Sequence, residues 1–340
     1  TGDTRIATDK GLLQFRDLVT RSTDGETFEV YTHDATNEEA PRETVSLTSP
    51  TQIMITGTNE IVRLEFSDGR AIECTPNHRF WTHNQGWVRA DELTDDDQVR
   101  LLDREVDFGM ASWEIPVSSQ TTDYQKRSSR KYSVNLPEKW TEDFAHYLGW
   151  LVGDGSLTKA AAVTVYGGEE EQQTLMLQHQ SLLADINGGT PPKPTAMQNG
   201  TYQLRVTRGA TRKFLEALGI TQAKSPEKRV PWSIFEAPKP IVAAFLRGLF
   251  DADGCVVNSG DKNRYVGLGS TSADLLRDVQ QLLDTYGVRG RIYSTRSGKD
   301  KAFEYTTRAG EHRTYASSPM HDLRITGSSL GSFNSRIGFE

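Results

Sequence analysis

Short runs of apolar and β-branched residues, separated by polar turns, make up most of the first 110 residues. This alternation predicts an all-β unit with little helix. The tetrapeptide Ser67-Asp68-Gly69-Arg70 stands between two of the runs and is typical of a hairpin turn. We expect strands at residues 27–31, 44–47, 52–55, 61–66, 71–74 and 98–102.

From residue 137 onward, helical and strand patterns alternate, and the same order of elements occurs twice. Tyr147–Gly155 and Leu246–Gly254 are apolar helix patterns that end in Asp-Gly, and they lie 99 positions apart. Each is followed by strand-rich sequence and then by an amphipathic helix that ends near a Leu-Leu pair and an aspartate. Self-similarity of this kind predicts a duplicated architecture.

A third matched segment fixes the length of the second copy. The pattern that begins at Leu204 recurs at Leu323, 119 positions later. The change from 99 to 119 gives the second copy about twenty additional residues, which we expect to form a long hairpin or loop at residues 297–313. The sequence thus predicts a tandem α-β-β-α-β-β-α duplication.

Charge divides the chain near residue 120. The 340 residues have a formal net charge of −7, but residues 1–120 hold 11 basic and 23 acidic side chains, a balance of −12. The remaining 28 basic and 23 acidic side chains give +5. Only the second part is therefore a candidate for a polyanionic partner such as nucleic acid. Residues 118–133 are polar and basic, and we expect a linker or DNA-facing arm there.

Composition excludes other classes of protein. The longest apolar stretch, Pro240–Phe250, is interrupted by Arg247 and is shorter than a membrane span. The N-terminus lacks a signal-peptide pattern. Cys74 and Cys255 are too few for a disulfide framework or a zinc site, so we expect two reduced packing residues in a cytoplasmic protein.

Small residues mark one face of each apolar helix. Gly149 and Gly153 are four apart in the first helix, as are Gly248 and Ala252 in the second, so the two helices can approach closely. This packing brings together the aspartates that end the helices, where the two charges repel each other. Mg²⁺ suits such a pair because it prefers oxygen ligands and assists phosphodiester hydrolysis. The alternative is that Asp-Gly merely ends each helix.

The second helix resembles the signature of the LAGLIDADG, or dodecapeptide, homing endonucleases, which residues Leu246–Gly254 match at seven of nine positions. The first helix is a weaker copy, with Val152 where the signature has its first aspartate. The resemblance implies a monomeric, pseudo-symmetric saddle whose two sheets lie along DNA. It also implies that Asp154 and Asp253 hold the divalent metal at the scissile phosphates.

The same family places an active-centre lysine after each repeat, and Lys228 fits that place in the first repeat. The alternative is a solvated lysine before a turn proline. The 119-residue offset puts its partner beyond Glu340, so we expect the second lysine outside this sequence. DNA contacts are expected from basic side chains of the arm and of both repeats: Lys126, Arg127, Arg130, Lys131, Arg205, Arg208, Arg212, Arg289, Arg291, Arg296, Lys299 and Lys301.

Part of the β unit, Gly69–Trp81 followed by Gly86–Leu93, resembles the second splicing block of inteins and their Hint fold, and Gly2-Asp3-Thr4 resembles the end of their first block. The resemblance implies that Thr75 and His78 contact the N-terminal splice junction, where the histidine polarises the bond. The alternative is a Thr-Pro turn with a satisfied histidine. The family's first nucleophile and final His-Asn pair are not in this sequence, so we expect splicing only in a parent polypeptide.

We therefore interpret the chain as a Hint-type splicing module at residues 1–118, a basic linker or arm at 119–136, and two α/β endonuclease repeats at 137–236 and 237–340. The expected function is an intein-encoded homing endonuclease that acts as a monomer. It would make a Mg²⁺-dependent double-strand break at a long, asymmetric DNA site in an intein-less host gene, and its parent would splice from host exteins. Two alternatives remain: a catalytically decayed insertion that only binds DNA, and pure self-processing with the α/β region as a structural insertion.

Overall fold

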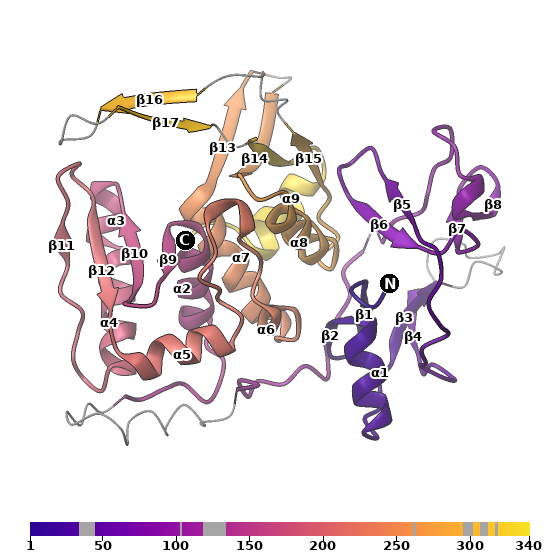
Figure 1. Cartoon of the computed structure of the whole chain (residues 1–340), viewed down its shortest axis with the longest axis horizontal. Coiled ribbons are helices and arrows are strands. Elements are labelled where there is room, and N and C mark those ends of the chain that lie inside the picture. The colour runs from indigo at the N-terminus through magenta and orange to yellow at the C-terminus, as the bar shows by residue number, and fades with distance from the viewer. Residues whose placement is uncertain are drawn as a thin grey trace.

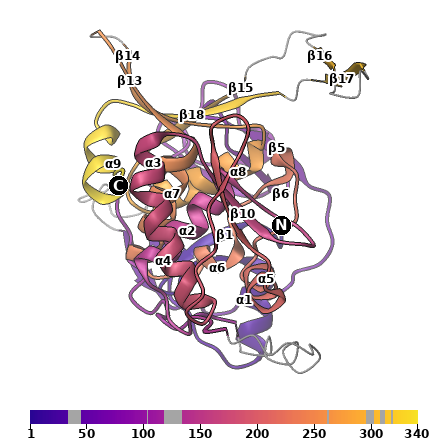
Figure 2. The ribbon, with the colours of Figure 1, turned by 90° about the vertical axis from the view of Figure 1, so that its left-hand side faces the viewer.

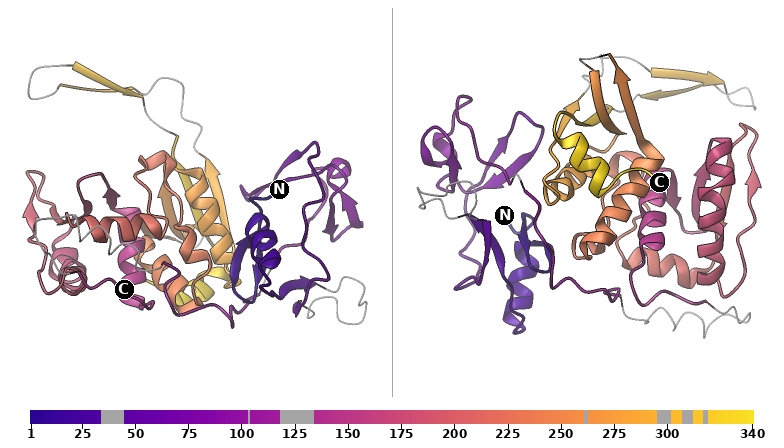
Figure 3. Two further views of the ribbon diagram at one scale, coloured as in Figure 1. Left: turned by 60° about the horizontal axis from the view of Figure 1, so that its bottom comes forward. Right: turned by 180° about the vertical axis from the view of Figure 1, so that it is seen from behind.

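The computed structural model describes residues 1–33, 45–102, 104–117, 134–260, 263–294, 302–306, 312–316 and 319–340. Figure 1 shows the N-terminal unit at one side, the second repeat in the middle and the first repeat at the far side. The view from behind in Figure 3 keeps the same neighbours. The order of the three parts in space therefore differs from their order along the chain.

Short strands and one α-helix build the N-terminal unit in the part that the structure describes: β1 (Arg5–Thr8), β2 (Gly11–Gln14), α1 (Phe15–Thr23), β3 (Val30–His33), β4 (Val45–Thr48), β5 (Val62–Glu65), β6 (Ala71–Cys74), β7 (Arg79–Thr82), β8 (Gly86–Arg89) and η1 (Ala90–Glu92). The first four strands form a sheet in the order β2-β1-β3-β4, and β5-β6 and β7-β8 are separate hairpins. Gly69 lies at the β5–β6 turn with a φ of 89°, so the predicted hairpin is confirmed.

The all-β prediction for this unit needs correction. Residues 52–55 are not a strand, and residues 98–102 contribute only the isolated bridge between Thr82 and Val99. Helix α1 interrupts the β pattern and is not predicted, because it is only nine residues long, directly follows a strand pattern and buries one side chain, Leu18. The other four predicted strands overlap observed ones.

The N-terminal unit has a small hydrophobic core. Its buried cluster consists of Leu13, Leu18 and Phe28. Within the described part of the unit, three side chains cannot supply the stability of an independent domain, so docking against its neighbours stabilises it. The segment that follows, which the prediction also assigns to the first unit, instead contributes to the large core of the repeats through Val106, Phe108 and Ile115.

Each repeat contains a long helix, a β-hairpin, further helix, two more strands and a final helix. The first repeat has α2 (Glu142–Gly153), β9 (Gly155–Leu157), β10 (Ala162–Tyr166), α3 (Glu169–Gln173), α4 (Leu175–Ile186), β11 (Thr195–Ala196), β12 (Tyr202–Val206) and α5 (Gly209–Ala217). After η3 (Ser225–Glu227) and α6 (Trp232–Phe235), the second has α7 (Lys239–Asp253), β13 (Gly254–Ser259), β14 (Asn263–Ser270), α8 (Ala273–Asp284), β15 (Gly290–Ser294), β16 (Ala302–Thr306), β17 (His312–Ala316), β18 (His321–Ile325) and α9 (Ser329–Arg336). The element order matches the predicted α-β-β-α-β-β-α pattern in both copies, except that the first copy divides its middle helix into α3 and α4 and the second copy adds the pair β16 and β17.

The two sheets have the same topology. Their strand orders are β9-β10-β12-β11 and β13-β14-β18-β15. Arg205 of β12 pairs with Val163, and Arg324 of β18 pairs with Gly267, so the two arginines occupy equivalent places. They are 119 positions apart, as the sequence offset requires. Figure 2 shows the second sheet across the top of the molecule, with α8 beneath it.

The additional residues of the second copy include a two-stranded ribbon. Strands β16 and β17 pair antiparallel, with Ala302 opposite Ala316 and Thr306 opposite His312. The ribbon lies between β15 and β18 in the chain, where a hairpin or loop is predicted, and it extends to residue 316. In the left panel of Figure 3 it projects away from both sheets.

Helices α2 and α8 begin at side-chain caps. Thr141 Oγ1 accepts a hydrogen bond from the amide of Phe144 at 3.2 Å to start α2, and Ser272 Oγ accepts one from the amide of Leu275 at 3.1 Å to start α8. Such caps satisfy amides that have no partner within the helix. Among the described residues, no helix is both long and apolar enough to cross a membrane.

Helices α2 and α7 pack backbone to backbone between the two sheets. A Cβ atom on Gly149 would collide with the carbonyl oxygen of Phe245, and a Cβ atom on Gly248 would collide with that of His146. These two contacts are related by the 99-residue offset. The helix pair therefore has a pseudo-twofold axis, and glycine is required where the backbones touch.

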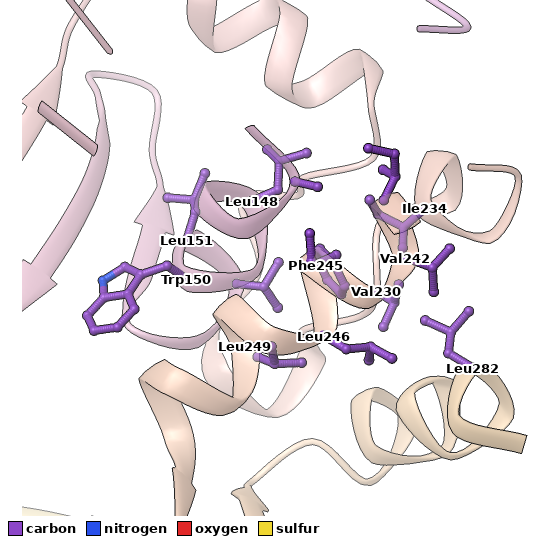
Figure 4. Packing of buried hydrophobic residues seen from close by; sticks show 14 of the residues in the cluster. Leu148, Trp150, Leu151, Val230, Ile234, Val242, Phe245, Leu246, Leu249 and Leu282 are labelled. Carbon is purple, nitrogen blue, oxygen red and sulfur yellow. The ribbon is translucent and has the colours of Figure 1, made fainter. Parts of the chain in front are cut away.

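Apolar side chains close the core around this contact, as Figure 4 shows. Leu148 and Leu151 of α2 and Phe245 and Leu249 of α7 are each at most 2% exposed. Leu282 of α8 reaches the same cluster from the side. Burying a side chain of this size contributes about 1.5–3 kcal/mol, so the helix pair is the main source of stability in the repeats.

The N-terminal unit docks on α6 and on the second repeat. Gly11, with a φ of 121°, lies against the main chain of Phe235, where a Cβ atom would collide. Arg70, at the β5–β6 turn, forms an ion pair with Asp284 of α8 at 3.0 Å. These contacts join residues more than 200 positions apart in sequence. They supply the support that the small core of the unit lacks.

Replacing Gly149 by alanine should destabilise the protein by about 2–4 kcal/mol, because the added methyl group collides with a carbonyl oxygen in a packed helix. Gly331→Ala is the matched control, since nothing lies within 4 Å of the added atom in α9. That substitution should stabilise the protein by about 0.5–1 kcal/mol. Urea unfolding measures both changes, and wild-type stability in Gly149→Ala would contradict the close approach of α2 and α7.

Candidate active site

The α2–α7 pair carries one carboxylate at each of its adjacent ends. Asp154 caps the C-terminus of α2, and Asp253 is the last residue of α7. Between them, Gly153 lies so close to Ala252 that a Cβ atom would come within 2.6 Å of the alanine Cβ. Helix C-termini carry partial negative charge, so both carboxylates lie where the helix dipole disfavours them.

The glycines that follow the two aspartates do not act as left-handed helix caps. Neither Gly155 nor Gly254 has a positive φ. Each begins a strand, and an added Cβ atom would collide with the carbonyl oxygen of Leu151 or Phe250. Glycine is therefore needed here to start each strand against the last helical turn, and not as a left-handed helix cap.

Both carboxylates hold protons more tightly than exposed aspartates do. Burial, followed by the charges of Asp253 and Glu171, raises the pKa of Asp154 to about 6, while Lys228 opposes this change. Burial also raises the pKa of Asp253, although its side chain is open to solvent on one side, and Lys228 again opposes the change. A bound cation would relieve both effects.

Lys228 brings its ammonium group to the end of α2, beside both carboxylates. Its Nζ donates hydrogen bonds to the carbonyl oxygens of Val152 and Gly153 at 2.6 Å and of Gly155 at 3.2 Å. Burial lowers the pKa of Lys228, and the two aspartates oppose the change. A cation at the last carbonyls of a helix offsets the helix dipole. The alternative of a fully solvated lysine before a turn proline is therefore wrong.

The donor set fits a hard divalent metal ion. Asp154 and Asp253 lie at the adjacent ends of the two helices, and the pKa of each carboxyl is raised. A bound cation would favour the ionised form of both carboxylates. In the described ranges, no group of three or more His, Cys, Asp or Glu side chains could hold a metal ion. An ion shared by two carboxylates would complete its shell with water and phosphate oxygens, as Mg²⁺ commonly does.

The outer face of the second sheet presents basic and aromatic side chains. Arg291 of β15 is exposed and pairs with Arg324 of β18. The Arg324 guanidinium lies 4.6 Å from the ring centroid of Tyr265 and 5.1 Å from that of Tyr293. Arg205 is exposed at the equivalent place of the first sheet. Such a surface offers charge to phosphates and planar groups to bases.

Arg324 is not among the predicted DNA contacts, although the sequence contains a signal for it. It is the 119-residue equivalent of Arg205, and applying that offset to each predicted contact finds it. Of the other predicted contacts, Arg208 stands at the start of α5, Arg289 is exposed, and Arg212 donates to a main-chain carbonyl. The remaining ones lie outside the described residues: Lys126, Arg127, Arg130, Lys131, Arg296, Lys299 and Lys301.

Thr75 and His78 lie between β6 and β7, close to the first residue of the chain. The amide of His78 donates to the carbonyl of Thr75 at 3.0 Å, which closes the turn. The amine of Thr1 donates to the carbonyl of Glu73 at 3.4 Å. Burial, and then the charge of that amine, lower the pKa of His78. The roles of Thr75 and His78 in splicing stay predictions.

The two cysteines differ in exposure. Cys74 is buried, and burial raises the pKa of its thiol, as expected for a packing residue. Cys255 is exposed on β13, so the expectation that both are packing residues is wrong for it. Its strand partner Gly267 is in turn opposite Arg324, and Cys255 therefore belongs to the same outer row of the second sheet.

The raised pKa of Asp154 predicts a pH-dependent stability in metal-free protein. Between the ordinary value of 3.8 and the folded value of about 6, the folded state binds more protons, so stability falls as the pH rises through this window. Asp154→Asn should therefore raise the free energy of unfolding at pH 8 by about 1–2 kcal/mol, and should have no such effect at about pH 3.5. Urea titrations in chelator measure the difference, and an equal change at both pH values would contradict this origin.

Comparison with known proteins finds relatives of several kinds. The chain is 30% identical over 259 residues to the replicative DNA helicase DnaB of Rhodothermus marinus, 27% over 286 residues to the ribonucleoside-diphosphate reductase NrdEB subunit alpha of Bacillus subtilis, and 29% over 265 residues to the tRNA-splicing ligase RtcB of Pyrococcus abyssi. These matches cover 74%, 78% and 70% of this chain. The chain spans only 24%, 23% and 29% of the length of these relatives.

Solved structures and a family profile give two further similarities. Mesophilic variants of the homing endonuclease I-DmoI superpose with a TM-score of 0.38 at 19% identity, over 58% of this chain and 95% of theirs. The N-terminal LAGLIDADG domain of DUF199/WhiA gives 0.35 at 15% identity, over 68% and 97%. Residues 240–338, which hold α7, Asp253 and the second sheet, match the profile described as LAGLIDADG-like domain. By sequence, this segment of the chain is therefore similar to the LAGLIDADG-like domain family.

Proposed function

We propose that residues 137–340 form a site-specific DNA endonuclease of the LAGLIDADG type, with Mg²⁺ as its cofactor. The observation that carries the proposal is the pair Asp154 and Asp253, which end two helices related by a pseudo-twofold axis, with Lys228 beside both. The family match of residues 240–338 supports the same assignment for the second repeat.

Asp154 and Asp253 would hold the metal ion through their carboxylate oxygens. A bound divalent ion stabilises negative charge on a phosphate and favours ionisation of its water. Lys228 uses its three donors on main-chain carbonyls, so it adds positive charge without occupying the carboxylate oxygens. That charge can stabilise the phosphate as negative charge develops.

The two sheets would bind duplex DNA along their outer faces. Arg205 and Arg324 lie at equivalent places of the two sheets, and Arg324 also donates to the Asp322 carboxylate at 2.6 Å, so each sheet would offer one arginine to a phosphate. The repeats otherwise differ in sequence, which suits a long, asymmetric site. Since both carboxylates belong to one chain, a monomer would be sufficient to cut both strands.

Wild-type protein with Mg²⁺ should linearise plasmids that carry an uninterrupted candidate insertion site. Asp253→Asn should slow cleavage by at least about 100-fold, because one of two metal ligands is lost, while DNA binding is retained. Glu142→Gln changes an exposed carboxylate at the other end of α2 and is the matched control. Gel assays of cleavage and of binding in Ca²⁺ give the two measurements.

Wild-type cleavage by Asp253→Asn would refute the metal-site assignment. Binding of a host-gene site without Mg²⁺-dependent cutting would instead favour a catalytically decayed DNA-binding insertion. Failure to bind any such DNA would favour pure self-processing, with the α/β region as a structural insertion.

We also propose that the N-terminal unit is a Hint-type splicing module, so that the chain belongs to an intein. Two observations favour it. The relatives are a helicase, a reductase and a ligase, and each matches over only about a quarter of its length, as an inserted element would. In addition, Thr1 lies against the segment that holds Thr75 and His78, where the splice junction is expected. The exteins of the parent protein would be its partners in this reaction.

A longer reading frame that includes natural flanking residues should yield joined flanks free of residues 1–340, detectable by mass spectrometry. His78→Ala should leave mostly uncleaved precursor, because no imidazole would then polarise the first scissile bond. His83→Ala, at an exposed position after β7, is the control. Normal joining in His78→Ala would refute the role of this histidine.

A further inference from the structure

Asp278 of α8 is a buried carboxylate where three segments of the chain meet. Its side chain is 3% exposed, and it accepts hydrogen bonds from Arg229 Nε and Nη2 at 2.6 and 2.7 Å. The amide of Val230 donates to it at 3.2 Å. Arg5 of β1 adds a fourth contact through Nη1 at 3.4 Å. A buried carboxylate needs such partners, because an unpaired charge in the interior is strongly unfavourable.

These contacts hold the main chain on both sides of Lys228. Ser272 Oγ, buried at the start of α8, donates to the carbonyl of Lys228 at 2.8 Å. Two residues later, the amide of Val230 is bound by Asp278. The segment that brings the lysine to the end of α2 in the first repeat is therefore clamped to α8 of the second.

Arg5 joins this clamp to the N-terminal unit. Its guanidinium lies 3.8 Å from the ring centroid of Phe235, and its side chain is only 13% exposed. The side chain of Arg229 is 47% exposed and also approaches Asp274 at 3.9 Å. Arg5 is thus the more deeply buried of the two cations at Asp278. Without it, the buried carboxylate would depend on an arginine that has a second acidic neighbour.

We propose that Arg5 is a positioning residue for Lys228, acting through Asp278 and Arg229. The N-terminal unit then contributes to the order of the active site without contacting metal or DNA. The effect on catalysis rests on the proposed nuclease function. The effect of Arg5 on the position of Lys228 does not depend on that function, because it follows from the hydrogen bonds and ion pairs described above.

Arg5→Ala should loosen the segment that carries Lys228. In metal-free protein, acetylation of Lys228 by acetic anhydride, followed by peptide mass spectrometry, should become about fivefold faster as its hydrogen bonds to carbonyls open more often. In cleavage assays with Mg²⁺, kcat should fall about tenfold, while the Kd for DNA measured in Ca²⁺ should change by less than about twofold.

Two alanine variants separate positioning from docking. Arg21→Ala removes another link between the N-terminal unit and the nuclease region, an ion pair with Glu236 at 2.7 Å, and should leave Lys228 protected. Arg16→Ala removes an exposed ion pair with Asp3 within the same unit and should do the same. Arg5→Lys keeps the positive charge and should restore most of the protection. If Arg5→Ala does not fold, Arg5→Gln is measured instead; it removes the charge but keeps a long side chain, and it should show the same increase in acetylation.

Unchanged acetylation of Lys228 in Arg5→Ala, or an equal increase in Arg21→Ala, would overturn the proposal. Slower cleavage with unchanged acetylation would overturn it as well. The acetylation assay needs neither metal nor DNA. It therefore decides the positioning role even if the wild-type chain cuts none of the tested DNA, a result that would refute only the nuclease function.

Discussion

The contact between α2 and α7 is the constraint on which the rest of the structure depends. Gly149 and Gly248 lack side chains, so the two helix backbones meet at symmetry-related positions. Each helix continues directly into the first strand of its sheet. The separation of the helices therefore sets both the spacing of Asp154 and Asp253 and the placement of the two sheets. One helix contact therefore determines the geometry of the carboxylate pair and the relative placement of the two sheets.

The groups at the end of the helix pair oppose the stability of the fold. Two carboxylates lie at helix C-termini, close to each other and partly shielded from water. Lys228 offsets this charge only in part, because its three hydrogen bonds go to carbonyl oxygens. Titratable groups held in such positions are typical of functional sites and unusual for purely structural ones. The buried carboxylate of Asp278 differs from these two, because Arg229 and the amide of Val230 donate hydrogen bonds directly to it.

Much of the repeat fold and of its carboxylate pair could be predicted, because both depend on local patterns that occur twice. The 99-residue offset identifies the helices, and the glycine spacing identifies their contact. The 119-residue offset also identifies Arg324 as the equivalent of Arg205. The exposure of Cys255 could not be predicted, because it depends on which face of β13 is covered by other elements. Helix α1 has apolar residues at helical spacing, but it is only nine residues long and directly follows strand β2. The docking of Arg5 on Asp278 joins residues 273 positions apart, and no local pattern in either segment encodes it.

The burial of α2 also has a consequence for how the protein is made. Ten of its twelve residues are buried, and α7, which covers its glycine face, begins only at Lys239. On the ribosome, α2 therefore emerges as an apolar helix well before its partner has been synthesised. Until then the nascent first repeat exposes a surface that chaperones recognise and that other chains can bind. The duplication thus gives the finished protein a shared core but delays the first half from folding until most of the second long helix has left the ribosome.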